Sequence, residues 1–464
     1  MCTAGYSPGM WEKRKPLLIG LALVLCGSVV AGIVIGKVFA PHNDGEAVQR
    51  VRQLGTEAVA RYEAQFVPNA DKTARSGSTA ATDLFDRLAQ SIEQVVAEDR
   101  YQHALTLQGE KQWSEWTGDE IEALAAFLGE FASLLDDIRA LAAIGEPVYH
   151  PDLSRGMGTE LPHLAPLRTM ARLLRFEAEI RAHSGNLEGA IENYHAILEL
   201  AETLAEEPIG FSQLVREALN RIAFESMGSA FPAGGIPLEQ ARSFVKRTEG
   251  IYHREGWANA LAHEAMLALN SVSTDPFVSV LSDELFAVIP ETNATVLTLL
   301  YPSPFGEMIV NADRETCAEF LDRIIHAAHK PYYEARVELN AIEAELATLS
   351  FSFLKGYTKA LVPQFSWAQV VQARNEAVLD LMRVGLVLEA HYAESGSYPA
   401  SLDAVAGGLG GSIAVDPFTG RPYVYRPEGD TFTLYSLGVN QQDDGGRHDY
   451  RDGDIVWRGV AVRE

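Results

Sequence analysis

Apolar residues recur every three to four positions over most of this chain, from residue 47 to about residue 372. One such stripe has four members, Leu84, Leu88, Ile92 and Val95. This spacing places apolar side chains on one face of an α-helix. The strict alternation that marks a strand is scarce before Ile413. The pattern therefore predicts a mainly α-helical body.

One apolar run is long enough to cross a membrane. Residues 16–36 contain no charged residue, and a helix of this length, at about 1.5 Å per residue, reaches the ~30 Å thickness of a bilayer core. Basic residues precede the run at 13–15, whereas Lys37 follows it and is succeeded by the acidic Asp44 and Glu46. Because basic residues favour the cytoplasmic side, we expect a cytoplasmic tail at 1–15, a single-pass anchor at 16–40 in a bacterial cytoplasmic membrane, and an exported bulk.

Two other kinds of N-terminal segment compete with this interpretation. A cleaved signal peptide has an apolar region of roughly 7–15 residues, which is shorter than this run, and Pro41 directly follows the candidate cleavage site at Ala40. A lipoprotein signal needs a small residue before its cysteine, but Leu25 precedes Cys26. The uncleaved anchor is the interpretation that these residues favour.

Charge and cysteine content narrow the classes of partner. The chain of 464 residues has a formal net charge of −25, which would repel the phosphates of a nucleic acid, so we expect no nucleic-acid partner. Divalent cations are the natural counter-charge. Of the three cysteines only Cys317 falls in the expected exported body, so no disulfide is expected within it.

One segment of the helical body resembles a tetratricopeptide unit. Residues 181–191 read as a helix–turn–helix. Small and packing residues fall where such a unit places them, at Ala178, Gly185, Ala190, Tyr194 and Leu198. A stacked solenoid needs about three repeats, and no second copy follows 34 residues later. A single helical hairpin within an α-helical domain is therefore the favoured interpretation.

The sequence contains no recognisable catalytic constellation, and we nominate no catalytic residue. His263 and Glu264 begin like a zinc-protease helix, but Leu267 replaces the second histidine that would hold the metal. His326 and His329 are one helical turn apart without a third ligand at suitable spacing. Trp113 and Trp116 are spaced for packing one helix against its neighbour.

The last ninety residues have a different pattern. A helix over 373–394, with Ala377, Leu381, Val384 and Leu388 on its apolar face, is followed by a turn at Tyr398-Pro399. Short strands are expected around 422–426, 431–437 and 455–458. We therefore predict that residues 373–464 form a small α+β domain, with one long helix packed on an antiparallel sheet, behind an α-helical exported domain at 41–372.

An acidic loop lies before the last expected strand. Its polar residues are Asn440, Asp443, Asp444, Asp449, Asp452 and Asp454, interleaved with glycines. Calcium takes six to eight hard oxygen ligands, and glycines let a loop fold around the ion. The spacing is not that of an EF-hand. A calcium site and a solvated acidic turn are the two interpretations of this loop.

The order of these C-terminal motifs resembles the C-terminal body of the major pseudopilin of type II secretion systems. There too a helix ends in Gly-x-Tyr-Pro-x-x-Leu, here at 396–402, and Asp-Pro, Tyr-x-Tyr and Leu-Tyr-Ser-Leu-Gly motifs precede a calcium loop. The resemblance implies that calcium is held by the Leu437 carbonyl and by Asn440, Asp452 and Asp454. In this chain Asn440 stands where an aspartate is common, and the loop is longer by residues 441–447.

Pseudopilin assembly features are absent from the sequence. A pseudopilin has a glycine cleavage site before its apolar helix and a glutamate inside it, and residues 16–36 carry neither signature. We first expect a non-enzymatic envelope protein that presents helical and pseudopilin-like surfaces to envelope or secretion-system proteins. The alternative is an envelope enzyme or a ligand-binding receptor with its site in a cleft of the helical domain.

Overall fold

The computed structural model describes residues 45–66, 80–111, 113–230, 236–249, 251, 254–274, 304–349, 355–447 and 453–457. The expected anchor at residues 16–36 lies outside these ranges. Among the described residues, no helix combines the length and the apolar character that a bilayer crossing requires.

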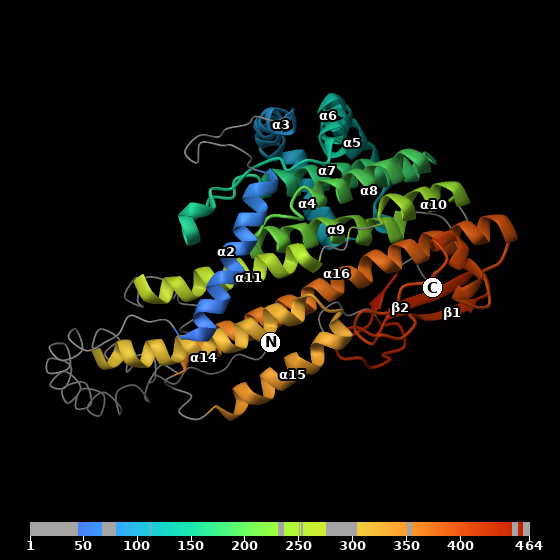
Figure 1. Cartoon of the computed structure of the whole chain (residues 1–464). Helices are drawn as coiled ribbons and strands as arrows, with labels where there is room; N and C mark the ends of the chain where they lie inside the picture. Colours follow the sequence, from blue (N-terminus) through green and yellow to red (C-terminus); the bar gives the residue numbers. More distant parts are fainter. Residues whose placement is uncertain are drawn as a thin grey trace, which may run out of the picture. The chain divides into compact units, whose positions relative to one another are not determined.

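The prediction of a mainly helical chain with a small antiparallel sheet near its C-terminus is confirmed (Figure 1). The first helices are α2 (Glu46–Phe66), α3 (Ala80–Val96), α4 (Asp99–Glu110), η1 (Trp113–Glu115), α5 (Gly118–Glu130), α6 (Ala132–Ile144), η2 (Leu153–Gly158), α7 (Leu164–His183) and α8 (Leu187–Glu202). They are followed by α9 (Gly210–Ala230), α10 (Leu238–Arg247), α11 (Arg254–Thr274), α14 (Pro304–Ala328), α15 (Tyr332–Thr348), α16 (Gly356–Ser395) and η4 (Leu402–Leu409).

The chain divides into two compact units, each made of segments that are distant in sequence. The first combines Met1–Thr56, Ala262–His326 and Glu338–Ser366, and the second combines Glu57–Leu261, Ala327–Val337 and Trp367–Glu464. The boundary expected near residue 372 lies inside α16, and the division into domains at 41–372 and 373–464 stays a prediction.

In the first unit, a buried carboxylate caps the N-terminus of α16, the longest of the described helices. Asp313 of α14 accepts hydrogen bonds from the backbone N–H of Tyr357 at 2.8 Å and from Thr358 Oγ1 at 2.6 Å. These groups lie at the N-terminus of α16, whose first backbone N–H groups have no partner within the helix. Burial raises the pKa of Asp313 to about 6, although these donors oppose the shift. Asp313 therefore caps α16 from another helix.

In the second unit, the expected hairpin is formed by α7 and α8. The chain turns at Gly185, where φ is +81°, and the Asn186 side chain accepts from the Gly189 N–H at 3.0 Å to cap α8. Ala178, Ala190 and Tyr194 are fully buried. The residues that the sequence pattern singled out therefore do pack the two helices together.

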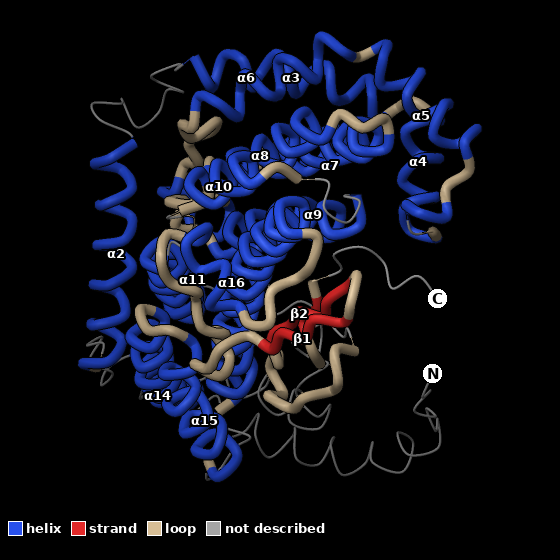
Figure 2. Tube along the Cα trace, turned by 90° about the vertical axis from the view of Figure 1, so that its right-hand side faces the viewer, coloured by secondary structure: helices blue, strands red, loops and turns tan. Residues whose placement is uncertain are grey.

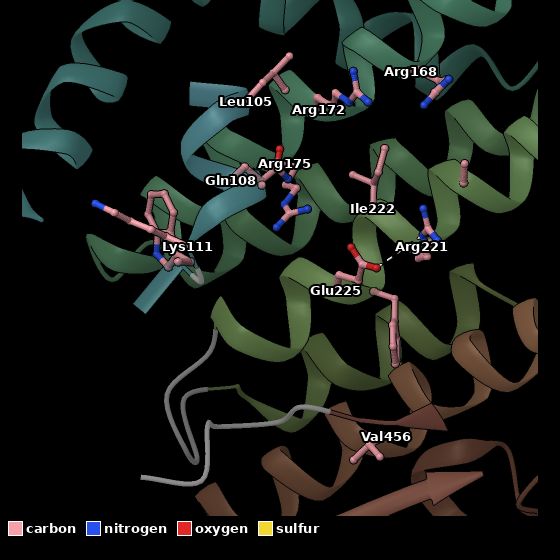
Figure 3. A pocket seen from close by; sticks show the side chains of 14 residues that line it. Leu105, Gln108, Lys111, Arg168, Arg172, Arg175, Arg221, Ile222, Glu225 and Val456 are labelled. Carbon is pink, nitrogen blue, oxygen red and sulfur yellow. Dashed lines mark ion pairs between the residues drawn. The ribbon is translucent and has the colours of Figure 1, made fainter. Parts of the chain in front are cut away.

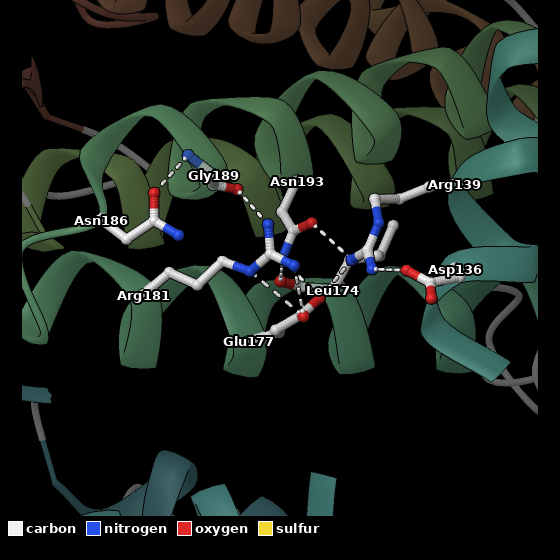
Figure 4. A network of polar contacts seen from close by, with 8 residues as sticks. All are labelled: Asp136, Arg139, Leu174, Glu177, Arg181, Asn186, Gly189 and Asn193. Carbon is white, nitrogen blue, oxygen red and sulfur yellow. Dashed lines mark hydrogen bonds and ion pairs between the residues drawn. The ribbon is translucent and has the colours of Figure 1, made fainter. Parts of the chain in front are cut away.

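Polar contacts fasten α6 to this hairpin (Figure 4). Glu177 of α7 accepts from Arg181 of the same helix at 2.7 Å and from Asn193 of α8 at 2.9 Å. Arg139 of α6 forms an ion pair with Glu177 and donates to Asn193 Oδ1 at 3.0 Å. One carboxylate thus joins three helices, and its charge is matched by two arginines.

The sheet has the order β1 (Val424–Glu428), β2 (Thr431–Ser436) and β3 (Ile455–Val456), and both neighbouring pairs are antiparallel. Strands β1 and β2 lie side by side (Figure 2). It joins the C-terminal half of α16 through long side chains. Tyr423 donates to Asp380 at 2.9 Å, and Tyr398 donates to Glu389 at 3.0 Å. Helix α16 ends at Ser395, and Gly396 follows with φ at +72°, so the predicted helix end is confirmed to within one residue.

The amphipathic character expected for residues 373–394 is not observed. The expected apolar face is buried, but four charged residues of the other face are also buried: Arg374, Glu376, Asp380 and Glu389. Their partners come from distant segments, as when Arg254 pairs with Glu376 at 2.8 Å. Because a buried charge must be paired or hydrogen-bonded, these contacts allow residues 373–390 of α16 to lie inside the unit without an exposed face.

Candidate functional site

A cleft of about 500 Å³ opens in the second unit and is lined mainly by α4, α7 and α9, with a contribution from β3 (Figure 3). Five of its lining side chains are cationic: Lys111, Arg168, Arg172, Arg175 and Arg221. We call this site the cationic cleft. Among the described residues of its lining, Glu225 is the single carboxylate. In a protein with a net charge of −25, such a concentration of positive charge is a local reversal of the overall balance.

Helix α7 supplies the cationic row. Arg168, Arg172 and Arg175 are spaced i, i+4 and i+7, which places them on one face of the helix. At about 1.5 Å of rise per residue, the row covers about 10 Å of the helix axis. The opposite face is anchored in the core by residues such as Met170 and Leu173, which are fully buried. The orientation of α7 therefore directs the row into the cleft.

Three of the five cations already have a carboxylate partner. Arg175 pairs with Glu179 at 2.9 Å, Lys111 pairs with Glu120 at 2.7 Å, and Arg221 lies 3.6 Å from Glu225. The Lys111 ammonium group holds the pKa of the Glu120 carboxyl at about 2. These pairs cancel three positive charges.

The remaining two cations are not matched. Within the described part of the chain, neither Arg168 nor Arg172 forms an ion pair. Arg168 is exposed and Arg172 is half-buried. The cationic cleft therefore carries an excess of about two positive charges, both on α7 and one helical turn apart.

Arg175 is held in place from inside the protein. Its partner Glu179 is 1% exposed and also accepts from Ser226 Oγ at 2.8 Å. The Tyr194 hydroxyl lies 2.8 Å from the same serine oxygen. Burial acts to lower the pKa of Arg175, but Glu179 outweighs it and the pKa is raised, so this guanidinium stays charged. A buried polar chain thus fixes the middle of the cleft.

Most of the remaining lining is apolar, with Gln108 and Glu225 as its polar members. Leu105, Trp113, Ile222 and Val456 line the cleft and are each half-buried. Trp113 lies against Trp116, with ring centroids 5.0 Å apart. Trp116 is buried and packs near Phe176, as expected for a packing residue. Trp113 was assigned to packing as well, but its ring also borders the cleft.

The side chains that line the cleft are suited to binding an anion. Among the described residues that line the cationic cleft there is no serine, threonine, cysteine or histidine, which are the usual nucleophiles and general bases. Glu225 is exposed and close to Arg221. Arginines, in contrast, are well suited to hold phosphate or carboxylate groups through paired hydrogen bonds.

The second candidate site is the acidic loop near the C-terminus. Ser436 of β2 pairs with Ile455 of β3, so Leu437 and Asp454, two of the expected calcium ligands, lie at the same end of this antiparallel ladder. Asn440, the third expected ligand, lies three residues after Leu437. Its side-chain amide donates a hydrogen bond to Asp444 at 3.1 Å. The fourth expected ligand, Asp452, lies outside the described residues.

Asp454 has the most unusual environment in this loop. It is fully buried, and one carboxylate oxygen accepts from the Gly446 N–H at 2.8 Å. Its other oxygen has no hydrogen-bond partner among the described residues. Burial raises the pKa of Asp454, and the carboxylates of Asp444 and Asp443 add to the shift. A hard cation beside the free oxygen would relieve both effects.

The described residues alone do not complete a metal site. No group of three histidine, cysteine, aspartate or glutamate side chains among them is arranged to hold an ion. Asp443 is engaged elsewhere, because it accepts from Tyr435 at 2.7 Å and pairs with Arg426 at 2.9 Å. The residues present supply one buried carboxylate oxygen, and a calcium site there would need Asp452 and backbone carbonyls as further ligands.

Comparison of the chain with protein-family models, curated proteins and solved structures finds no match.

Proposed function

We propose that this protein binds an anionic ligand in the cationic cleft. The observation that carries the proposal is the pair of unmatched arginines, Arg168 and Arg172, on the face of α7 that lines the cleft. The neighbouring Arg175 is already fixed by Glu179, so the site is partly organised before a ligand arrives, which lowers the entropic cost of binding. This is the ligand-binding alternative of the two functions expected from the sequence.

The proposal predicts that single arginine substitutions weaken anion binding. We expect Arg172→Ala to weaken the binding of inorganic pyrophosphate to the full chain by about tenfold, and Arg168→Ala to weaken it by a smaller factor. A hydrogen bond to a charged group contributes roughly 1.5–3 kcal/mol, and an exposed arginine contributes less than a half-buried one. Isothermal titration calorimetry at two salt concentrations measures the effect, and affinity should fall as salt increases.

Arg87→Ala is the matched control. Arg87 is an exposed helical arginine on α3 that does not line the cleft, so its replacement removes the same charge elsewhere. If Arg87→Ala weakens binding as much as Arg172→Ala does, the effect comes from net charge and the proposed site is wrong. Failure of the unsubstituted protein to bind pyrophosphate at low salt would also contradict the proposal.

A second function is supported by the orphaned oxygen of Asp454. We propose that calcium binds at the acidic loop as a structural clip, with Asp454, Asp452, Asn440 and the Leu437 carbonyl as the ligands implied by the pseudopilin resemblance. The ion would supply positive charge where Asp454 is buried without a counter-charge. It would hold the start of β3 against the end of β2.

Calcium should therefore raise the melting temperature of the full chain. Binding at a hundredfold excess over Kd adds about 2.7 kcal/mol to the free energy of unfolding, and magnesium should serve poorly because it requires a tighter octahedral shell. Melting is followed by circular dichroism with calcium, magnesium or a chelator. Asp454→Asn should abolish the calcium effect, whereas Asp403→Asn, at an exposed position in η4, should keep it. If the melting temperatures with calcium and with chelator are equal, the calcium proposal is wrong and the loop is a solvated acidic turn.

The remaining expectations from the sequence stay predictions. They are the single-pass anchor, the bacterial envelope location, the tetratricopeptide-like character of the α7–α8 hairpin, and association with envelope or secretion-system proteins through a pseudopilin-like module. The cleft is built from residues 105–225 and Val456, and ligand binding there is compatible with each of these predictions.

A further inference from the structure

The cationic cleft has two chemically different parts, and together they restrict the ligand more than its charge alone does. The row on α7 provides the positive charge, whereas Leu105, Trp113, Ile222 and Val456 present apolar surface to the same cavity. A simple inorganic anion would contact only the first part. It would leave an aromatic ring and three aliphatic side chains facing water.

The charge balance limits the head group. Three of the five cations are matched by Glu179, Glu120 and Glu225, which leaves the charges of Arg168 and Arg172. A ligand group with two negative charges would neutralise them. A phosphate monoester carries nearly two negative charges at neutral pH, and the planar guanidinium group binds its oxygens in pairs.

The apolar part limits the rest of the ligand. The Trp113 ring packs against Trp116, which is itself buried near Phe176, so one side of the ring is covered by the protein. Phe224 and Val456 extend the apolar lining toward the C-terminal sheet. A cavity of about 500 Å³ is within the range of pockets that enclose small organic ligands.

From these observations we infer that the cleft binds a phosphate monoester whose ester group is apolar and aromatic or of similar width. The inference rests on the proposed function and specifies its ligand class. The phosphate lies against Arg168 and Arg172, with Arg175 beside it, and the apolar group covers Trp113 and Ile222. The inference is one of binding without a covalent step: among the described lining residues there is no serine, threonine, cysteine or histidine, and Lys111 is paired with Glu120.

The test compares three probes on the full chain by isothermal titration calorimetry. 1-Naphthyl phosphate and methyl phosphate share a head group, whereas 1-naphthyl phosphate and 1-naphthol share an apolar group. We expect 1-naphthyl phosphate to bind at least tenfold more tightly than methyl phosphate, which corresponds to about 1.4 kcal/mol. Removing about 60 Å² of apolar surface from water is sufficient for this difference. 1-Naphthol should not bind measurably.

Two substitutions assign the apolar contribution to the cleft. Trp113→Ala should remove most of the difference between the two phosphates and leave the affinity for methyl phosphate within twofold. Trp367→Ala is the matched control, because Trp367 is 49% exposed on α16 and does not line the cleft. If Trp113→Ala lowers the melting temperature of the protein, Ile222→Ala provides a second test. It should reduce the difference in affinity between the two phosphates by about threefold.

The outcomes separate this inference from the proposed function. If both phosphates bind equally, the ligand class is wrong while the anion site stands. If 1-naphthol binds as tightly as its phosphate, the arginines do not select the ligand and the class is also wrong. If neither the phosphate esters nor pyrophosphate bind, the proposed function fails together with the inference.

Discussion

Replacing Asp416 by alanine is expected to lower the free energy of unfolding by about 3 kcal/mol. The carboxylate is 1% exposed and accepts four hydrogen bonds. The donors are the N–H of Phe418 at 3.0 Å, Thr419 Oγ1 at 3.1 Å, Ser436 Oγ at 2.8 Å and the N–H of Leu437 at 3.2 Å. Alanine would leave these donors without an acceptor, and each of the two that are fully buried, the Phe418 N–H and Ser436 Oγ, costs roughly 1–3 kcal/mol unless it finds a new partner.

The identity of the replacement separates charge from hydrogen bonding. Burial raises the pKa of Asp416 although the four donors oppose the shift, so losing the negative charge alone should cost little. An asparagine side chain at this position would keep one acceptor oxygen, and we expect Asp416→Asn to lose about half of what Asp416→Ala loses. Chemical denaturation of the full chain measures both variants.

The control for this prediction is Asp403→Ala. Asp403 lies in the same C-terminal region but is exposed, and a surface substitution of this kind usually changes stability by less than about 0.5 kcal/mol. If Asp416→Ala were as stable as Asp403→Ala, the hydrogen bonds to Asp416 would not hold the sheet to the loop before it.

The outline of the fold could be predicted because the evidence for it is local in the sequence. The stripe at 84–95 indicates α3, and Gly185 marks the turn between α7 and α8. Alternation at Phe432 and Leu434, both buried, indicates β2. Each signal involves residues within one element or its adjoining turn, where helix and strand periods are directly visible.

The burial of α16 could not be predicted in the same way. Arg374, Glu376 and Asp380 look like an exposed polar face when the helix is considered alone. The groups that make their burial tolerable, such as Arg254 for Glu376 and Tyr423 for Asp380, lie more than forty residues away in the sequence. A periodicity argument has no means of detecting such distant partners.

The cationic cleft was missed for a related reason. Its cations come from Lys111, from α7 and from Arg221, and only the fold brings these segments together. One signal was present: the i, i+4, i+7 arginine row at 168–175 in a chain with a net charge of −25. Three cations on one helical face of an acidic protein can indicate an anion site, but the sequence does not show which of them already have a carboxylate partner.

The acidic loop is the reverse case, because the sequence reveals its motifs but not the burial of its side chains. Its motifs were conspicuous in the sequence, and the structure places Leu437 and Asp454 at one end of the β2–β3 ladder. The calcium ligands stay a prediction, because Asp452 lies outside the described residues. The buried free oxygen of Asp454 could not be found from the sequence, since burial depends on the complete fold.

Gly438→Ala is expected to destabilise the protein by about 4 kcal/mol, for two reasons that can be measured separately. Gly438 has φ at +62°, a left-handed conformation that costs a residue with a side chain roughly 1–2 kcal/mol. In addition, a methyl group there would overlap the backbone carbonyl oxygen of Gly453. That carbonyl cannot turn away as a side chain could, so we assign overpacking of this kind a further cost of about 1–3 kcal/mol.

Gly429→Ala isolates the first reason. Gly429 has φ at +71° in the turn between β1 and β2, but a methyl group there would meet no atom within 4 Å. We expect this variant to lose only about 1–2 kcal/mol, and the difference between the two variants in chemical denaturation measures the clash with Gly453. Because Gly453 leads directly into β3, whose Val456 belongs to the apolar lining of the cationic cleft, Gly438→Ala should also weaken the binding of 1-naphthyl phosphate, whereas Gly429→Ala should not. Equal losses of stability in the two variants would mean that the close approach of residues 438 and 453 does not help to hold β3 in place.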